Sequence, residues 1–146
     1  MNRRSRASLA FHGSIVILLG LLAGFPYAFV ISGDIEGEVR AWRMAHLEGV
    51  LNGLVLLGVG AAGSALELAE RQTRLLITSL LVAGYGNVVA AVIGASFGVR
   101  GLTAAGPPSN FIVFALFTAA IIGVFLGLGL TVLGAFKSLR AGDRAA

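Results

Sequence analysis

A histidine followed by glycines at helical spacing is the feature of this sequence most suited to chemistry. It is His46, in the stretch Trp-Arg-Met-Ala-His-Leu-Glu-Gly-Val-Leu-Asn-Gly at positions 42–53. On an α-helix, Gly49 and Gly53 would lie on the face of His46, one and two turns further along. An imidazole beside such a bare strip could hold the iron of a haem while the macrocycle lies against the helix. The alternative interpretation is a Gly-x-x-x-Gly seam against which a second helix packs.

The composition limits other kinds of metal site. The chain has no cysteine and only two histidines, whereas zinc sites use three or four protein ligands. A haem needs one protein ligand and leaves the opposite axial position free for a substrate oxygen. His12 and His46 could instead both ligate one haem, as in an electron-transfer protein, although we expect them near opposite membrane faces. The alternative for His12 is an interfacial residue beside the N-terminal arginines.

Polar side chains inside apolar segments are costly in a bilayer and are therefore candidates for function. Asn52, Tyr85 and Asn87 could orient a substrate, and the alternative for each is a hydrogen bond between helices. Arg43 and Arg100 could pair with the carboxylates of a haem, or they could anchor the helix ends at the interface.

A carboxylate also occurs in this stretch. Glu48 is expected about 200° around the helix from His46, so it points away from the proposed haem face. It could form an ion pair with Arg43 or Arg100, or it could act on a proton.

The composition places these residues in a membrane protein. Of the 146 residues, 57% are hydrophobic and 12% are charged, against about 25% charged in an ordinary soluble domain. Runs at about 8–31, 42–66, 75–97 and 111–136 are each long enough to cross a bilayer, which takes about 20 residues of helix. We predict an all-α integral membrane protein, a bundle of four transmembrane helices that forms one domain over residues 1–146.

The positions of the basic residues predict the orientation. The N-terminal tail, the 67–74 turn and the C-terminal tail hold eight Lys or Arg residues, and the other two loops hold three. The positive-inside rule therefore places both termini in the cytoplasm, with the protein in the inner (cytoplasmic) membrane. Because the basic residues flank the apolar runs, the net charge of +4 indicates lipid contact and not a nucleic acid partner. The eight are Arg3, Arg4, Arg6, Arg71, Arg74, Lys137, Arg140 and Arg144.

The glycine content predicts close helix packing. The chain has 21 glycines, many of them within the apolar runs, and small residues let transmembrane helices approach closely. Four helices of this length enclose little volume, so a pocket for both a cofactor and a substrate forms more easily between subunits. We therefore expect a homo-oligomer.

Several motifs resemble a known family, the small four-helix membrane isomerases that include hydroxylaminobenzene mutase and styrene oxide isomerase. The most specific part is the His-x-x-x-x-x-Asn-Gly pattern from His46 to Gly53. The resemblance covers nearly the whole chain. The other matching motifs are Phe11-His12-Gly13, Thr73-Arg74-Leu75-Leu76, Gly84-Tyr85-Gly86-Asn87-Val88 and Arg100-Gly101-Leu102-Thr103.

This resemblance implies a trimer with haem b at the subunit interfaces and His46 as the iron ligand. In styrene oxide isomerase the ferric iron acts as a Lewis acid on an epoxide oxygen, and a hydride shift then gives an aldehyde. Asn52 would lie in the same pocket, and Asn87 matches an asparagine of the third helix.

The chain departs from styrene oxide isomerase at two positions of the third helix, where Ala83 and Ala91 replace an aspartate and a tyrosine. The His-Leu-Glu-Gly-Val sequence is closer to the mutase branch. The sequence therefore favours rearrangement of an aryl hydroxylamine to an aminophenol, with a small aromatic substrate. Isomerisation of an epoxide and a non-enzymatic haem or electron-transfer role are the alternatives.

Overall fold

The structure, a computed structural model, describes residues 1–143 and is all-helical within them. Four long helices follow one another: α1 (Arg3–Ser32), α2 (Val39–Ala62), α3 (Glu70–Phe97) and α4 (Pro108–Asp143). A short 3-10 helix, η1 (Gly63–Ala65), continues α2. Each of the four long helices is long and apolar enough to cross a membrane. Arg144 lies outside the described residues, so its predicted place in the C-terminal basic group has no structural counterpart here.

The helix ends follow local sequence signals. Asn2 caps α1, because its side-chain oxygen accepts a hydrogen bond from the Ser5 amide at 2.8 Å. Gly33 ends α1 and Gly98 ends α3 with φ of 82° and 65°, a backbone conformation that glycine adopts without strain. Pro108 begins α4, where its missing amide hydrogen leaves no bond unmade. Three helices contain the predicted apolar runs and extend beyond most of their ends, whereas α2 ends at Ala62, before the end of the predicted run 42–66.

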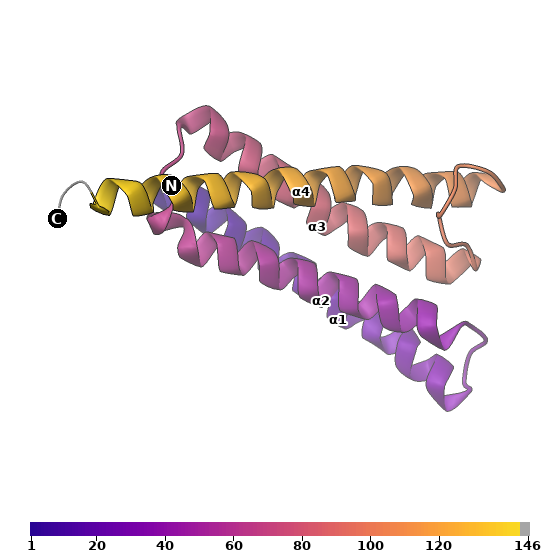
Figure 1. Cartoon of the computed structure of the whole chain (residues 1–146). Helices are drawn as coiled ribbons and strands as arrows, with labels where there is room; N and C mark the ends of the chain where they lie inside the picture. Colours follow the sequence, from indigo (N-terminus) through magenta and orange to yellow (C-terminus); the bar gives the residue numbers. More distant parts are fainter. Residues whose placement is uncertain (144–146) are drawn as a thin grey trace.

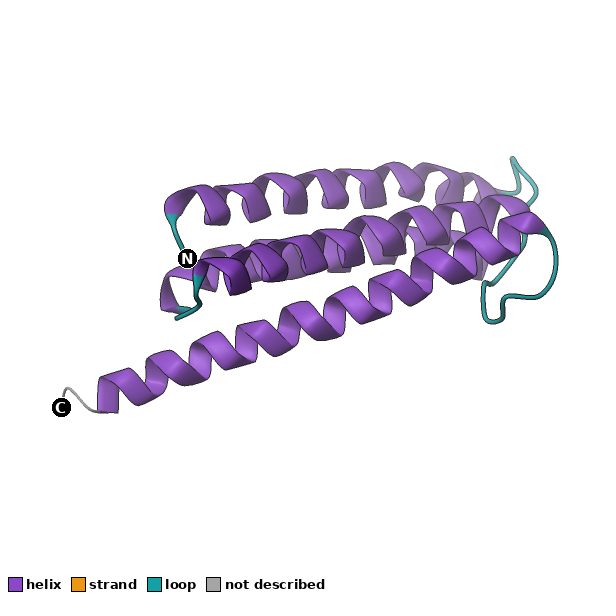
Figure 2. Ribbon diagram, turned by 90° about the horizontal axis from the view of Figure 1, so that it is seen from above, coloured by secondary structure: helices purple, strands orange, loops and turns teal. Residues whose placement is uncertain are grey.

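The helices associate as two antiparallel pairs. Helix α1 packs along α2, and α3 packs along α4 (Figure 1). The pairs meet mainly through α2 and α3, whereas α2 and α4 make almost no contact. The view from above shows α4 running on past the ends of the other helices (Figure 2). The two pairs draw apart towards the end that holds the 33–38 and 98–107 loops.

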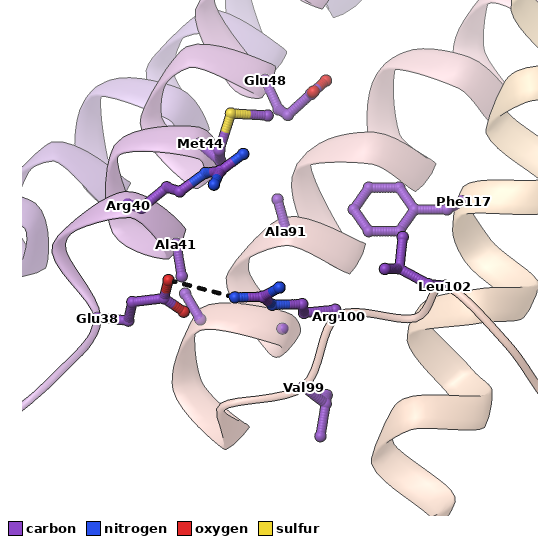
Figure 3. A pocket seen from close by; sticks show the side chains of 12 residues that line it. Glu38, Arg40, Ala41, Met44, Glu48, Ala91, Val99, Arg100, Leu102 and Phe117 are labelled. Carbon is purple, nitrogen blue, oxygen red and sulfur yellow. Dashed lines mark ion pairs between the residues drawn. The ribbon is translucent and has the colours of Figure 1, made fainter. Parts of the chain in front are cut away.

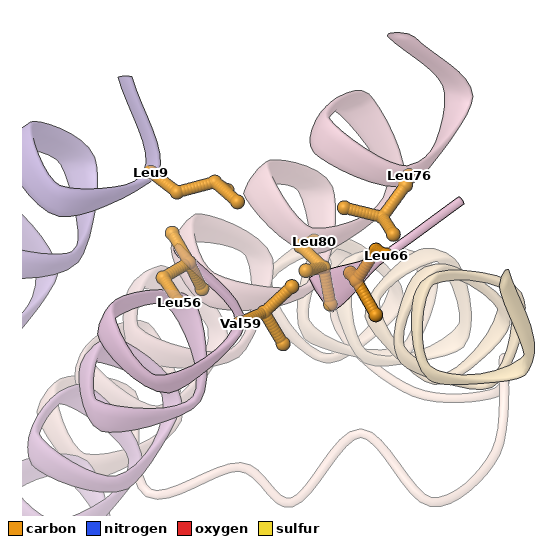
Figure 4. Packing of buried hydrophobic residues seen from close by; sticks show 6 residues of the cluster. All are labelled: Leu9, Leu56, Val59, Leu66, Leu76 and Leu80. Atoms are coloured by element: carbon orange, nitrogen blue, oxygen red, sulfur yellow. The ribbon is translucent and has the colours of Figure 1, made fainter. Parts of the chain in front are cut away.

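Leucines fill the interior at the opposite end, where the chain begins. There Leu9 of α1, Leu56 of α2, and Leu76 and Leu80 of α3 form one buried cluster (Figure 4). At the loop end the buried side chains are smaller, and Ala23, Ala45 and Ala91 form a second cluster. Many large apolar side chains lie on the outside, such as Phe125 at 76% exposure. Apolar side chains on the outside as well as in the interior are typical of a chain surrounded by lipid or by further copies of itself.

The contact between α1 and α2 is a glycine seam. A Cβ on Gly49 would fall on the Gly20 backbone, and one on Gly20 would lie 2.6 Å from the Val50 amide nitrogen. A Cβ on Gly53 would lie 2.6 Å from the Gly13 carbonyl oxygen. The bare strip beside His46 is therefore filled by α1, so the prediction that a macrocycle lies flat against Gly49 and Gly53 is wrong, whereas His46 as an iron ligand stays a prediction. The packing-seam interpretation is confirmed.

Substitution in this seam gives a direct test of the packing. We expect Gly49→Ala to lower the thermal unfolding temperature in detergent, because an added methyl group forces two backbones apart at about 1–3 kcal/mol. Gly58→Ala on the same helix is the matched control, since nothing lies within 4 Å of its Cβ. That control should unfold at an equal or higher temperature, because alanine is the better helix former. Equal stability of both variants would contradict the seam.

Candidate active site

His46 is half-buried between α1 and α2, with its ring held by three residues of α1. Its Nδ1 atom is 2.9 Å from the Gly20 carbonyl oxygen. A carbonyl only accepts, so Nδ1 carries the hydrogen and Nε2 carries the lone pair. The ring stacks on Tyr27 with a centroid distance of 6.4 Å. A Cβ on Gly24 would lie 3.1 Å from His46 Nδ1, so only glycine leaves full room for the imidazole.

The second nitrogen of this ring is free to bind. Among the described residues, no hydrogen bond reaches His46 Nε2, and no buried side-chain nitrogen or oxygen lacks a partner. The Nε2 lone pair is therefore accessible at the outer surface of the chain. A histidine whose Nδ1–H donates to a backbone carbonyl while Nε2 stays open has the arrangement that metal-ligating histidines use. The His46 side chain could hold the iron of a haem.

A chain of hydrogen bonds joins α2 and α3 on the opposite face of α2. Asn52 Nδ2 donates to the Glu48 carbonyl oxygen at 2.9 Å and to Glu48 Oε2 at 2.8 Å. Asn87 Nδ2 donates to Asn52 Oδ1 at 3.1 Å. Asn52 therefore forms the interhelical hydrogen bond that was its alternative interpretation. Because its amide is already bonded, the side chain left to meet a substrate here is the Glu48 carboxylate.

Glu48 borders a cavity of about 280 Å³ near the loop end. The walls come from Met44 of α2, Ala91 of α3 and Phe117 of α4, and Figure 3 shows these side chains around a common space. The volume is close to the lower limit of small-molecule pockets, about 300 Å³. It suits a small aromatic molecule and is too small for a haem.

An ion pair lies at the mouth of this cavity. The Arg100 guanidinium is 3.8 Å from the Glu38 carboxylate (Figure 3). Arg40 lines the same mouth. The predicted ion pair of Glu48 with Arg43 or Arg100 is therefore wrong, because Glu48 bonds to an amide and Arg100 pairs with another acid. Arg43 is exposed, and it makes no ion pair within residues 1–143.

The structure brings Tyr85 to a different partner. The Tyr85 hydroxyl is 2.9 Å from His12 Nδ1, and the two rings meet edge to face. This pair ties α1 to α3 and does not border the cavity. The sequence suggested that Tyr85 could orient a substrate. Within one chain, however, Tyr85 does not line this cavity.

The two histidines of one chain lie at different levels along α1. His46 bonds at the level of Gly20, eight residues beyond His12 on α1, which is about 12 Å along the helix axis. The two rings of one chain are therefore too far apart to ligate one iron. Within the described residues, no three His, Cys, Asp or Glu side chains form a metal-binding group.

Sequence reasoning missed the residues that surround the two candidate groups. Tyr27 and Gly24 hold the imidazole, but the sequence gives no register between α1 and α2 that would pair them with His46. Glu38 and Arg40, which line the cavity, were not among the residues that the sequence singled out. Glu38 is the N-cap residue of α2 and Arg40 lies in its first turn, and the cavity opens at this end of the helix.

The fold and these two groups define a class: an all-helical protein whose four long helices could cross a membrane. It has an accessible imidazole and a separate small, mainly apolar cavity that a carboxylate borders. A family model described as styrene oxide isomerase matches residues 5–136. A styrene-oxide isomerase of Pseudomonas fluorescens is 26% identical over 155 residues, covering 94% of this chain and 91% of that protein. The chain belongs to the styrene oxide isomerase family, and it is an isomerase. The resemblance found in its motifs is confirmed.

Proposed function

We propose that the protein is a membrane epoxide isomerase that converts a small aryl epoxide such as styrene oxide to the corresponding aldehyde. The observation that carries the proposal is the family match across residues 5–136. It favours the epoxide over the aryl hydroxylamine that the motif around His46 indicates. The inner membrane, with both termini cytoplasmic, is the proposed location and is supported by the excess of basic residues at the end where the chain begins.

The two third-helix alanines are compatible with epoxide chemistry. Ala91 lines the cavity, and Ala83 packs against Gly123 of α4, where a glycine Cβ would lie 3.5 Å from its methyl group. Neither position presents a polar group to the cavity. The carboxylate there comes from α2 instead, through Glu48. An acid is therefore available without the third-helix aspartate.

We also propose haem b as the cofactor, with His46 as the iron ligand. The accessible Nε2 lone pair and the carbonyl that fixes the tautomer support this assignment. Arg43, one turn before His46 on α2, would be close enough to reach a haem carboxylate. When bound, the haem would supply a Lewis acid to the epoxide oxygen.

The geometry supports an oligomer in which one site uses two copies. His46 faces α1, whereas Glu48 faces α3 and α4, so the two cannot converge within one chain. The cavity opens between α2 and α4, which barely touch. A neighbouring copy could place its His46 surface across this opening. We propose a homo-oligomer, a trimer by family resemblance, in which imidazole and carboxylate of adjacent subunits meet at one substrate.

The chain's residues then have distinct roles in a balanced isomerisation. One C–O bond of the epoxide breaks, a hydride moves to the carbon that becomes electron-poor, and a C=O bond forms without any added reactant. The Glu48 carboxylate would stabilise the positive charge that develops on that carbon. The Met44, Ala91 and Phe117 walls would hold the aromatic ring and exclude water, which would otherwise trap the cation as a diol.

A parallel substrate comparison tests the proposal. The protein would be purified in mild detergent and supplied with styrene oxide or with phenylhydroxylamine. We expect the aldehyde to form rapidly and 2-aminophenol to form slowly or not at all. Product identity would be measured by mass spectrometry. Faster formation of 2-aminophenol would contradict the epoxide assignment and restore the mutase interpretation.

A further inference from the structure

A second cleft lies at the end of the bundle opposite the proposed active site. It has a volume of about 600 Å³ and separates the first turns of α1 and α3. Its walls come from residues 1–8 of one segment and residues 68–77 of the other. The proposed isomerisation uses none of these residues.

Thr73 is the informative side chain in this cleft. The residue is buried, with 7% of its surface exposed, yet its hydroxyl makes no hydrogen bond to any described residue. Thr118 and Thr131 differ, because each donates to the carbonyl four residues earlier, at 2.8 and 3.0 Å. Every fully buried side-chain oxygen in residues 1–143 has a hydrogen-bond partner. Because the Thr73 hydroxyl has none, this oxygen is not fully buried. It opens onto the cleft that the residue lines.

Other hydrogen-bond donors line this cleft. Ser5 and Ser8 of α1 line the same cleft, and neither side chain hydrogen-bonds within the described chain. Arg4 and Arg74 contribute two positive charges at its edge. Both α1 and α3 begin here, and the free amides of a helix N-terminus favour an anion.

One acid also lines the cleft. Glu70 is 3.9 Å from Arg74, and both side chains are largely exposed, at 84% and 74%. Such a pair contributes little to stability, so Arg74 can turn towards a stronger anionic partner. The cleft therefore keeps a net positive charge around three hydroxyl groups.

The apolar side of the cleft indicates what carries the anion. Leu68 and Ile77 are half-buried and line the same space as the hydroxyls and guanidiniums. A ligand that fills it combines a phosphate with an acyl chain. In the membrane placement proposed above, on which this inference rests, the basic end of the bundle lies at the headgroup level of the cytoplasmic leaflet. Basic pockets between helices at that level bind anionic lipid headgroups.

We propose that the cleft between the starts of α1 and α3 binds the phosphate headgroup of an anionic phospholipid. The Thr73, Ser5 and Ser8 hydroxyls donate hydrogen bonds to the phosphate oxygens, and Arg4 and Arg74 balance its charge. The acyl chain begins along Ile77.

Lipid binding to the delipidated full-length protein in detergent tests this site. Native mass spectrometry would compare phosphatidylglycerol with phosphatidylcholine of the same acyl chains, without substrate, so the result is independent of isomerase activity. We expect tighter binding of phosphatidylglycerol. Thr73→Val keeps the side-chain shape and should weaken that binding about tenfold by removing one charge-assisted hydrogen bond. Arg4→Gln should weaken it similarly, and it changes only an exposed side chain.

The matched controls are Thr118→Val, whose hydroxyl is already bonded to its own helix, and Arg40→Gln at the opposite end. Both should bind phosphatidylglycerol as the unmodified protein does. Equal binding of the two lipids, or unchanged binding by both Thr73→Val and Arg4→Gln, would overturn the proposal. Inorganic phosphate is the last arm. Full competition by millimolar phosphate would assign the cleft to the free ion and would equally overturn the lipid assignment.

Discussion

Replacing His46 with alanine is expected to abolish haem binding and to reduce epoxide isomerisation by about 1,000-fold or more. A Lewis acid contributes several kcal/mol to such a reaction, and each 1.36 kcal/mol corresponds to tenfold in rate. His46 is the side chain whose open Nε2 and carbonyl-bonded Nδ1 suit it to hold the iron. The measurements are the Soret absorbance of the purified variant and its rate of aldehyde formation. Both should fall together.

The matched control is the other histidine. His12→Ala removes a bond to Tyr85 and should cost about 1 kcal/mol of stability, but it should leave the Soret band in place. Free imidazole added to His46→Gly should restore part of that band, because the small ligand can occupy the space left by the ring. A haem-free His46→Ala protein with full activity would eliminate the iron-based mechanism.

The four helices follow from the sequence because the physics of the bilayer leaves little choice. An apolar run of about 20 residues can cross a membrane only if its backbone hydrogen bonds are made internally, so each run predicts a helix. The ends were less predictable. The segment from Arg3 to Ser8 is polar, which argues against a membrane span, yet it has no glycine or proline to stop the helix. Helix α1 therefore begins well before the apolar run.

The site was harder to predict because it depends on contacts between distant segments. His12 and Tyr85 are 73 positions apart, and no local pattern pairs them. The glycines after His46 show the limit clearly. A bare strip for a macrocycle and a seam for a second helix have the same sequence, and only the position of α1 against Gly49 decides between them. The structure places His46, Asn52 and Asn87 in the two groups described above, and their roles in the reaction stay predictions.

Replacing Glu48 with glutamine is expected to lower the maximal rate of epoxide isomerisation about 100-fold with little change in KM. Removing one preorganised electrostatic partner of a transition state typically has an effect of this size. Glutamine keeps the size of the side chain and an oxygen that can accept the Asn52 hydrogen bond. The substitution therefore removes the negative charge and preserves the link between α2 and α3. Steady-state kinetics of aldehyde formation would measure the effect.

Two comparisons separate charge stabilisation from a structural role. Glu38→Gln removes the other acid that lines the cavity, but its ion pair with Arg100 is exposed and weak, so its rate should change little. A para-methyl group on the substrate ring donates electrons to the developing cation and should restore part of the rate lost in Glu48→Gln. That rescue is specific to a carboxylate opposite positive charge, because a misplaced helix would slow both substrates equally. An equal loss for both substrates would assign Glu48 to holding Asn52 in place and would remove it from the chemistry.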